Sequence, residues 1–337
     1  MKQIIKQINQ IASKLGTIKI MEVCGGHTHT IMKYGLRDLL PNNIKLISGP
    51  GCPVCVSSKH DVDCVIKLAQ SGVKIATYGD MLRVPGSECN LQDAKAAGAD
   101  IKTIYSTSDV LSEPDRVFFA IGFETTTPMT AFLLKKGIKI FSSHKLIPPA
   151  MKILVKEMDL DGFIDPGHVS AIMGENAWHK LKLPAAQVIA GFEPEQLLSA
   201  ILLLLKLIQD KKQIVVNGYP QVVSKEGNKK AQKLIQETMK VVDSEWRGFG
   251  VLKKSGLDPI NQKLDAKKVF ADLLTNVKTK KDKGCCCPQV IRGLMEPKQC
   301  PLFAKTCSPQ NPQGACMVSL QEGACAIAYQ YGRSLSE

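Results

Sequence analysis

Short apolar segments, each followed by a glycine-containing loop or a helical pattern, recur along most of this chain. They span residues 18–23, 44–47, 74–78 and 101–105, and then 117–121, 139–142, 163–164, 188–192 and 214–217. Strands that alternate with helices are typical of parallel sheets covered by helices on both faces. The sequence therefore predicts an α/β fold with two doubly wound parallel-sheet domains, one in residues 1–112 and one in 113–220.

The last third of the chain differs in composition. Residues 221–283 are polar and read as helical, whereas 284–332 are rich in Cys, Pro and Gly with little periodicity. Such a composition is expected where metal ligation replaces an apolar core. We predict a third unit, residues 221–337, made of a helical segment and a small cysteine-rich domain.

Composition indicates the cellular compartment of the protein and the kinds of partner to expect. The first 16 residues form an amphipathic pattern and not a signal peptide, and the apolar run 197–208 is too short to cross a membrane. We therefore expect a cytoplasmic protein without a membrane partner. In a reducing compartment its 12 cysteines favour metal or redox chemistry over structural disulfides.

The formal net charge is +13, which raises the question whether the protein binds nucleic acid. The lysines are spread along the chain without interleaved aromatic residues, and no helix-turn-helix or RNP pattern is present. Solvated helix faces and a linker explain the charge better, so we expect no nucleic-acid partner.

The run CGGHTH (24–29) follows the first apolar segment directly. Ligands bind at the carboxyl ends of strands in open α/β sheets. Cys24 offers a soft thiolate, and His27 and His29 offer imidazoles, while the two glycines allow a bulky group to approach. A glycine-rich turn that carries buried core histidines is the alternative.

Cys52 and Cys55 form a C-x-x-C sequence between a strand and a helix. A helix N-terminus stabilises a thiolate, and Pro53 suits the first helical position. A dithiol/disulfide couple and half of a metal site remain the two interpretations. If the strands before Cys24 and Cys52 are neighbours, their thiols converge, and such a pocket suits iron or another soft metal.

Polar loops also follow strands in the second half. Glu124 in GFETTTP and His168 in PGHVS are expected to line the opposite wall of a cleft. Glu124 could act as a base or orient an imidazole, and His168 could donate a hydrogen bond to an anionic ligand. Helix capping by the threonines and a turn histidine are the alternatives. Asp80 and Arg83 read as an ion pair that closes a loop.

The tail holds four cysteines at intervals of 7, 9 and 9, namely Cys300, Cys307, Cys316 and Cys325. Four thiolates in a loop-rich segment suit a [4Fe-4S] cluster or a four-thiolate zinc site. Cys285, Cys286 and Cys287 are additional candidates. Cys64 and Cys89 are interpreted as buried thiols.

Six runs together resemble the HypD family of hydrogenase maturation proteins. They are CGGHTH (24–29), GPGCPVC (49–55), YGDMLRVPGS (78–87), GFETTTP (122–128), PGHVS (166–170) and the cysteine-rich tail. The resemblance implies two α/β domains flanking a cleft and a third domain with a [4Fe-4S] cluster. It also implies a role as the scaffold on which the Fe(CN)2(CO) unit of [NiFe]-hydrogenase is assembled.

The resemblance implies roles and partners residue by residue. Cys24 matches the thiolate that holds the assembling iron with its cyanide and carbonyl ligands, and His27 matches the histidine of that motif. Cys52 and Cys55 match a redox pair, through which we expect the cluster on the four tail cysteines to deliver electrons. The implied partners are a HypC-type small chaperone and a HypE-type donor whose thiocyanate supplies cyanide.

Two features depart from the family pattern. Cys286 makes a triple cysteine, followed by Pro288 in place of glycine, and the segment from Cys316 to Cys325 is one residue longer than usual. The expected protein is an assembly scaffold more than a conventional turnover enzyme. A stand-alone thiol-disulfide oxidoreductase and a zinc-stabilised nucleic-acid binder are the competing hypotheses.

Overall fold

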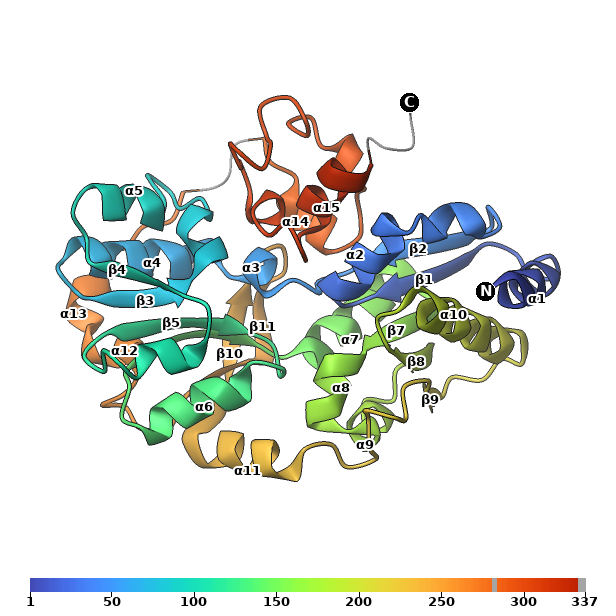
Figure 1. The fold of residues 1–337 in the computed structure, drawn as a ribbon, viewed down its shortest axis with the longest axis horizontal. Coiled ribbons are helices and arrows are strands. Elements are labelled where there is room, and N and C mark those ends of the chain that lie inside the picture. The colour runs from blue at the N-terminus through green and yellow to red at the C-terminus, as the bar shows by residue number, and fades with distance from the viewer. Residues whose placement is uncertain (281–283, 333–337) are drawn as a thin grey trace.

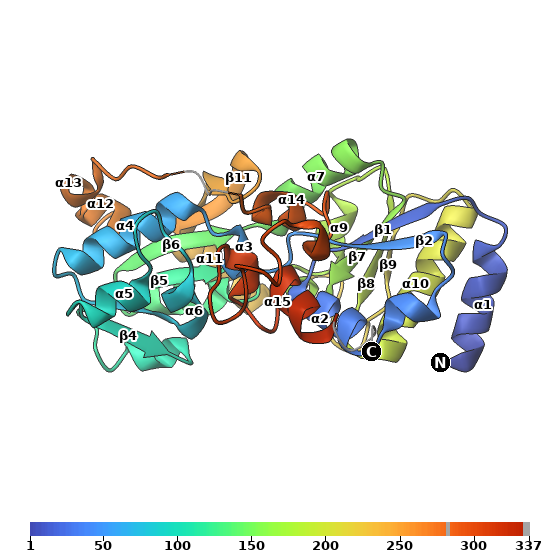
Figure 2. The same cartoon turned by 90° about the horizontal axis from the view of Figure 1, so that it is seen from above.

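A computed structural model describes residues 1–280 and 284–332. It contains two β-sheets side by side, and the cysteine-rich segment lies above the junction between them (Figures 1 and 2). The predicted α/β class with parallel-rich sheets is therefore confirmed. The predicted third unit includes residues 281–283 and 333–337, which lie outside the described residues.

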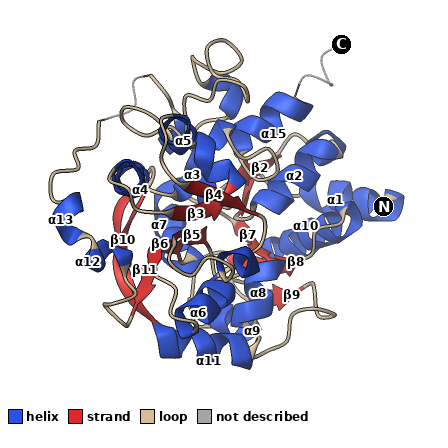
Figure 3. Ribbon diagram, turned by 60° about the vertical axis from the view of Figure 1, so that its left-hand side comes forward, coloured by secondary structure: helices blue, strands red, loops and turns tan. Residues whose placement is uncertain are grey.

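Sheet A is parallel throughout. Its strands, in the spatial order β2-β1-β7-β8-β9, are β1 (Ile18–Glu22), β2 (Ile44–Ser48), β7 (Gly162–Pro166), β8 (Ala186–Ala190) and β9 (Val215–Asn217). The three central strands β1, β7 and β8 are short and almost wholly buried because helices cover both faces, which is the expected setting of a parallel sheet (Figure 3).

Sheet B is mixed. Its strands, in the order β10-β11-β6-β5-β3-β4, are β3 (Ile75–Tyr78), β4 (Ile101–Ile104), β5 (Val117–Gly122), β6 (Ile140–Lys145), β10 (Met239–Trp246) and β11 (Gly250–Pro259). The first four in chain order pair in parallel, and the β10–β11 hairpin adds to β6 in antiparallel fashion.

The helices occupy the connections between strands. They are α1 (Lys2–Ala12), α2 (Gly25–Lys33), α3 (Pro53–Val56), α4 (Lys59–Gln70), α5 (Leu91–Ala96), α6 (Thr127–Lys135), α7 (Ile147–Met158), α8 (Gly167–Met173), α9 (Glu175–His179), α10 (Pro194–Gln209), α11 (Lys229–Thr238), α12 (Ala266–Val269), α13 (Ala271–Leu274), α14 (Cys287–Ile291) and α15 (Ala324–Tyr331). Short 3-10 turns are η1 (Leu36–Leu39), η2 (Gly79–Arg83), η3 (Thr107–Val110), η4 (Pro297–Gln299) and η5 (Ala315–Met317). Over residues 1–280 and 284–332, no helix is long and apolar enough to cross a membrane.

The chain crosses between the sheets several times, which differs from the predicted division at residue 112. Strands β1 and β2 belong to sheet A, β3–β6 to sheet B, β7–β9 to sheet A again, and β10–β11 to sheet B. Residue 112 falls between β4 and β5, which lie in the same sheet. Periodicity identifies strands, but the choice of sheet depends on contacts far apart in sequence.

The helical interpretation of residues 221–283 is wrong for the part that forms the β10–β11 hairpin. Strand β10 contains Lys240, Asp243 and Glu245, whose side chains are exposed at the edge of sheet B. Edge strands carry such charges because they prevent pairing with other chains. The polar composition of these strands is therefore the reason that the sequence pattern did not predict them.

One large apolar core joins both sheets and the cysteine-rich segment. It includes Met21 and Phe163 of sheet A, Phe119 and Phe141 of sheet B, and Cys316. Smaller clusters lie on the outer faces, one under α1 and α10 of sheet A and one under α6 of sheet B. The three parts of the molecule thus share a core and do not fold around separate ones.

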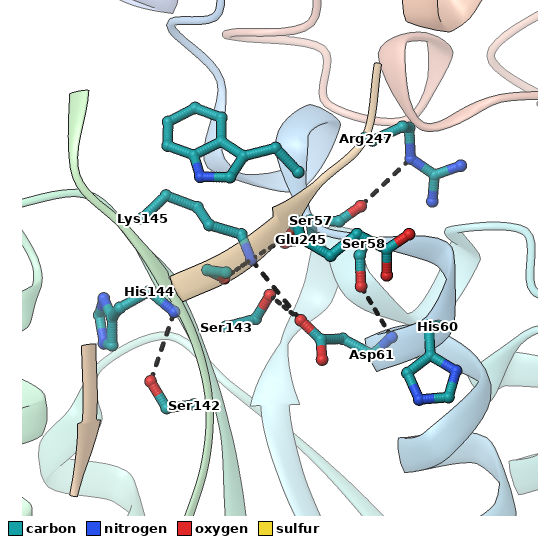
Figure 4. Close-up of polar contacts among 12 residues, drawn as sticks. Ser57, Ser58, His60, Asp61, Ser142, Ser143, His144, Lys145, Glu245 and Arg247 are labelled. Carbon is teal, nitrogen blue, oxygen red and sulfur yellow. Dashed lines mark hydrogen bonds and ion pairs between the residues drawn. The ribbon is translucent and has the colours of Figure 1, made fainter. Parts of the chain in front are cut away.

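A buried lysine ties the hairpin to the rest of sheet B (Figure 4). Lys145 is 0 % exposed, and its Nζ donates hydrogen bonds of 2.7 Å to Ser244 Oγ and to the Glu245 carbonyl. The same Nζ lies 3.7 Å from Asp61 Oδ2, which also accepts a hydrogen bond from Ser143. The network connects β6, β10 and α4.

We expect Lys145→Met to lower the free energy of unfolding by about 3 kcal/mol, because it removes one of the two lysines beside the buried Asp61 carboxylate, leaving Lys267 at 4.0 Å, and takes the donor away from the Glu245 carbonyl. Lys74→Met is the matched control, since Lys74 pairs with Asp115 at 2.7 Å on the surface, where an ion pair contributes at most about 1 kcal/mol. Urea unfolding of both variants measures the difference. Equal losses would show that the buried pair has no special role.

Candidate functional site

Cys24 lies at the carboxyl edge of sheet A, between β1 and the first turn of α2. Its backbone is extended, and it is the N-cap residue of that helix. Strand β1 pairs in parallel with β2 from Ile18–Ile44 to Glu22–Ser48, so the loop that follows β2 reaches the same edge. The predicted adjacency of the two strands is confirmed, and Cys52 follows at the end of that loop.

Two glycines allow three chain segments to meet at Cys24. A Cβ on Gly51 would lie 2.4 Å from the Cys24 Cα, and a Cβ on Gly25 would lie 2.4 Å from the Cβ of Glu322. The Gly25 N–H also donates a hydrogen bond of 3.1 Å to the Gly51 carbonyl. The first turn, the C-x-x-C loop and the cysteine-rich segment are therefore in direct contact.

Carboxylates surround the Cys24 thiol. Glu22 is 1 % exposed, and its carboxylate accepts hydrogen bonds from the Cys24 N–H, at 3.0 Å, and from the Thr28 hydroxyl. Burial raises the pKa of Glu22 to about 7. Burial, and then the charge of Asp80, raise the pKa of Glu322 to about 7 as well. Sequence reasoning did not identify Glu22 or Glu322, because no local motif marks either of them.

This environment disfavours a free thiolate and favours a cation. Burial, and then the charges of Glu322 and Glu22, raise the pKa of Cys24 to about 12. An anionic sulfur beside anionic oxygens is costly unless a positive ion neutralises them, and a bound metal ion deprotonates its thiol ligand. The site therefore suits a metal ion better than an activated nucleophile.

His27 lies one helical turn from Cys24 and is 0 % exposed. Burial lowers the pKa of His27 to about 4, so its imidazole is neutral at pH 7. Neither ring nitrogen makes a hydrogen bond of standard geometry among the residues that the structure describes, although the backbone of Ala190 and Gly191 lies close to the ring. A buried polar nitrogen without a good hydrogen bond needs an explanation. Binding of a metal ion or another ligand by the imidazole is one such explanation. His29, in contrast, lies 3.3 Å from the Tyr331 hydroxyl.

Glu124 and His168, which were predicted to line the same wall of a cleft, follow strands of different sheets. His168 lies in the first turn of α8 after β7, the strand that pairs with β1 of sheet A. Glu124 lies in the loop after β5 of sheet B, where its Oε1 accepts a hydrogen bond of 3.1 Å from the Ile147 N–H at the start of α7. Burial raises the pKa of Glu124 to about 7.

Cys52 and Cys55 form a disulfide, with Cα atoms 5.3 Å apart. As predicted, Cys52 is the N-cap residue of α3 and Pro53 occupies the first turn. At the other end of α3, the Arg247 N–H donates to the Val56 carbonyl at 2.9 Å, and its Nε donates to the Ser57 carbonyl at 3.2 Å (Figure 4). The hairpin thus holds the C-x-x-C segment in place.

The four predicted tail ligands are free and buried, with exposed fractions of 2–8 % for Cys300, Cys307, Cys316 and Cys325. The Cys316 Sγ lies 2.8 Å from the Cys287 Sγ, so a further thiol belongs to this group. Cys64 is buried as predicted, whereas Cys89 is only half-buried. Within the described part of the chain, no three Cys, His, Asp or Glu side chains are arranged to hold a single metal ion.

Comparison with known proteins identifies the family. A family model named HypD, described as the hydrogenase formation hypA family, matches residues 1–332. The chain belongs to the HypD family. It is 42 % identical to the hydrogenase maturation factor HypD of Rhizobium leguminosarum bv. viciae, over 98 % of this chain and 93 % of that protein.

Two further members of the HypD family cover the chain to a similar extent. The HypD maturation factor of Escherichia coli K12 is 41 % identical over 99 % of this chain and 96 % of its own length. A putative hydrogenase expression/formation protein of Methanocaldococcus jannaschii is 44 % identical, over 98 % and 97 % respectively. The family resemblance noted from six sequence runs is therefore confirmed.

We expect the stability of this protein to fall as the pH rises from about 4.5 to about 7, in part because of Glu124. Its pKa is about 7 when folded and 4.5 ordinarily, so in this range the unfolded chain loses a proton that the folded chain keeps. The contribution is on the order of 3 kcal/mol. Glu124→Gln should remove that part of the decline in urea midpoints between pH 5 and 7.5.

Glu113→Gln is the control for this titration. Hydrogen bonds from Lys102 and Arg116 lower the pKa of Glu113, so its contribution has the opposite sign and is complete above its ordinary pKa. The decline between pH 5 and 7.5 should persist in this variant. The assignment to Glu124 fails if Glu124→Gln and the unaltered protein decline in parallel.

Proposed function

We propose that this chain acts in hydrogenase maturation as the scaffold on which the Fe(CN)2(CO) unit is assembled, with the iron bound as cargo by Cys24. The observation that carries the proposal is the position of Cys24. It lies where the end of β1, the C-x-x-C loop and Glu322 of the cysteine-rich segment meet. Groups that bind iron, change its ligands and supply electrons can act together only at such a junction.

The surroundings of Cys24 support binding of an iron cation. Glu22 and Glu322 provide negative charge near the sulfur. Thiolate and neutral imidazole are suitable donors for Fe(II). His27 supplies a buried neutral imidazole whose nitrogens make no hydrogen bond of standard geometry within the described residues. We therefore assign the sulfur of Cys24 as the primary ligand and His27 as a supporting group.

Attachment of cyanide to iron in a low oxidation state requires reducing equivalents, and the C-x-x-C pair supports such chemistry. Reduction of the Cys52–Cys55 disulfide consumes two electrons and two protons and yields two thiols. The Gly51 backbone in the same loop packs against Cys24, while the Cys55 Sγ lies 4.0 Å from the Ala315 carbonyl in the cysteine-rich segment. We assign this pair as the dithiol between the two regions.

The tail cysteines support a resident [4Fe-4S] cluster. Four free, buried thiols in a loop-rich segment match its ligand chemistry. We assign Cys300, Cys307, Cys316 and Cys325 as ligands; such a cluster supplies one electron at a time.

The proposal includes partner proteins. A HypC-type chaperone would share the iron through its own cysteine, and a HypE-type protein would supply cyanide from its thiocyanate. Both would have to reach Cys24, which is only partly buried.

A stand-alone thiol-disulfide oxidoreductase is the second candidate, and the Cys52–Cys55 disulfide favours it. It predicts turnover with a general disulfide substrate that persists in Cys24→Ala. Loss of that turnover together with Cys24 would exclude this candidate.

For the scaffold, we expect protein purified anaerobically with its chaperone to show nitrile and carbonyl stretches in the infrared spectrum. Cys24→Ala should abolish these bands because it removes the primary iron ligand. Cys64→Ala, the same substitution at a buried free thiol of α4, should keep them. Bands that survive in Cys24→Ala would contradict the assignment of the ligand, and their absence from the unaltered complex would contradict the scaffold itself.

For the cluster, we expect reconstituted protein to contain iron and acid-labile sulfide in near-equal amounts and to give a paramagnetic signal on reduction. Cys307→Ser should lose most of both, because a serine oxygen is a poor substitute for a soft thiolate. Cys64→Ser, the same substitution at a buried free thiol of α4, should keep both. Zinc in place of iron and sulfide would rule the cluster out.

A further inference from the structure

The aromatic ring of Phe192 contacts two imidazoles. Phe192 follows β8, and its ring centroid is 4.9 Å from that of His27 and 4.0 Å from that of His168, with interplanar angles of 35° and 24°. Tyr219 contacts the ring edge-on at 6.5 Å. Phe192 lies outside the six sequence runs that resemble the family.

The ring is also in contact with the turn that carries Cys24. A Cβ on Gly26 would lie 3.1 Å from the Phe192 ring and 3.8 Å from the Cys24 Sγ. The Thr30 hydroxyl of α2 donates a hydrogen bond of 2.8 Å to the Phe192 carbonyl. Both the backbone and the ring of Phe192 are therefore held against α2.

Solvent exposure increases from His27 through Phe192 to His168. His27 is fully buried, Phe192 is half-buried, and His168 is exposed to solvent. The ring of Phe192 is thus the layer that separates the His27 imidazole from the surface on this side. Stacked aromatic contacts restrict the orientation of a ring beyond what burial alone does.

We propose that Phe192 is a positioning residue, which holds the His27 imidazole in its buried orientation beside Cys24 and closes this side of the site to water. His168, which is exposed, stacks on the same ring. The role in holding iron rests on the proposed function, whereas the role in shielding His27 does not. Without the aromatic ring, the His27 imidazole would have a free volume to rotate into and a path to solvent.

The test is chemical modification of histidines in the intact chain, followed by peptide mapping. Diethyl pyrocarbonate should modify His168 readily and His27 slowly in the unaltered protein. Phe192→Leu should raise the rate for His27 by about tenfold, since the loss of two aromatic contacts makes local opening easier. Phe192→Tyr, which keeps the ring, should restore the slow rate.

Phe141→Leu is the matched control for general loss of stability, since it removes a buried ring in contact with Phe119 in sheet B. It should leave the His27 rate unchanged. The proposal is overturned if Phe192→Leu leaves His27 as protected as before, or if Phe141→Leu accelerates it equally.

Infrared spectra separate this inference from the proposed function. If the unaltered complex shows the iron-bound stretches, Phe192→Leu should weaken or shift them and Phe192→Tyr should keep them. If the unaltered complex shows none, the scaffold proposal fails, while the modification rates still decide whether Phe192 shields His27.

Discussion

The parallel pairing of β1 with β2 is the constraint on which the candidate site depends. It brings the residues that follow both strands to one edge of sheet A, and the two glycines at positions 25 and 51 let the following loops touch. A one-residue shift in this register would turn the side chains of β1 to the opposite face. The position of Cys24 relative to the C-x-x-C loop is therefore a property of the sheet.

Two kinds of cysteine environment result from this arrangement. Cys24 faces carboxylates in a buried setting, which disfavours its thiolate unless a cation is present. Cys52 is the N-cap residue of a short helix and is bonded to Cys55. The same sheet edge thus carries a thiol suited to a metal and a pair suited to electron exchange, which is the combination that the proposed assembly reaction requires.

The cysteine-rich segment reaches this edge because it shares the central core. Its residues Val290, Met317 and Ala326 pack in the same apolar cluster as Met21 and Phe119 of the two sheets. Its docking places Glu322 beside Gly25. A change in the tail can therefore alter the surroundings of Cys24 directly.

The sequence by itself determined the α/β class, most strand positions, the N-cap position of Cys52, the grouping of the chemically important motifs and the family. These features follow from local periodicity, capping preferences and short runs of residues. Only the tertiary structure decided that His168 lies on the sheet of Cys24, that Glu124 caps a helix elsewhere, and that 239–259 form a hairpin. It alone revealed Glu22 and Glu322 beside the thiol and Phe192 in contact with both histidines. The physical reason is that these contacts join segments far apart in the chain, and their energies depend on burial and packing that no local pattern encodes.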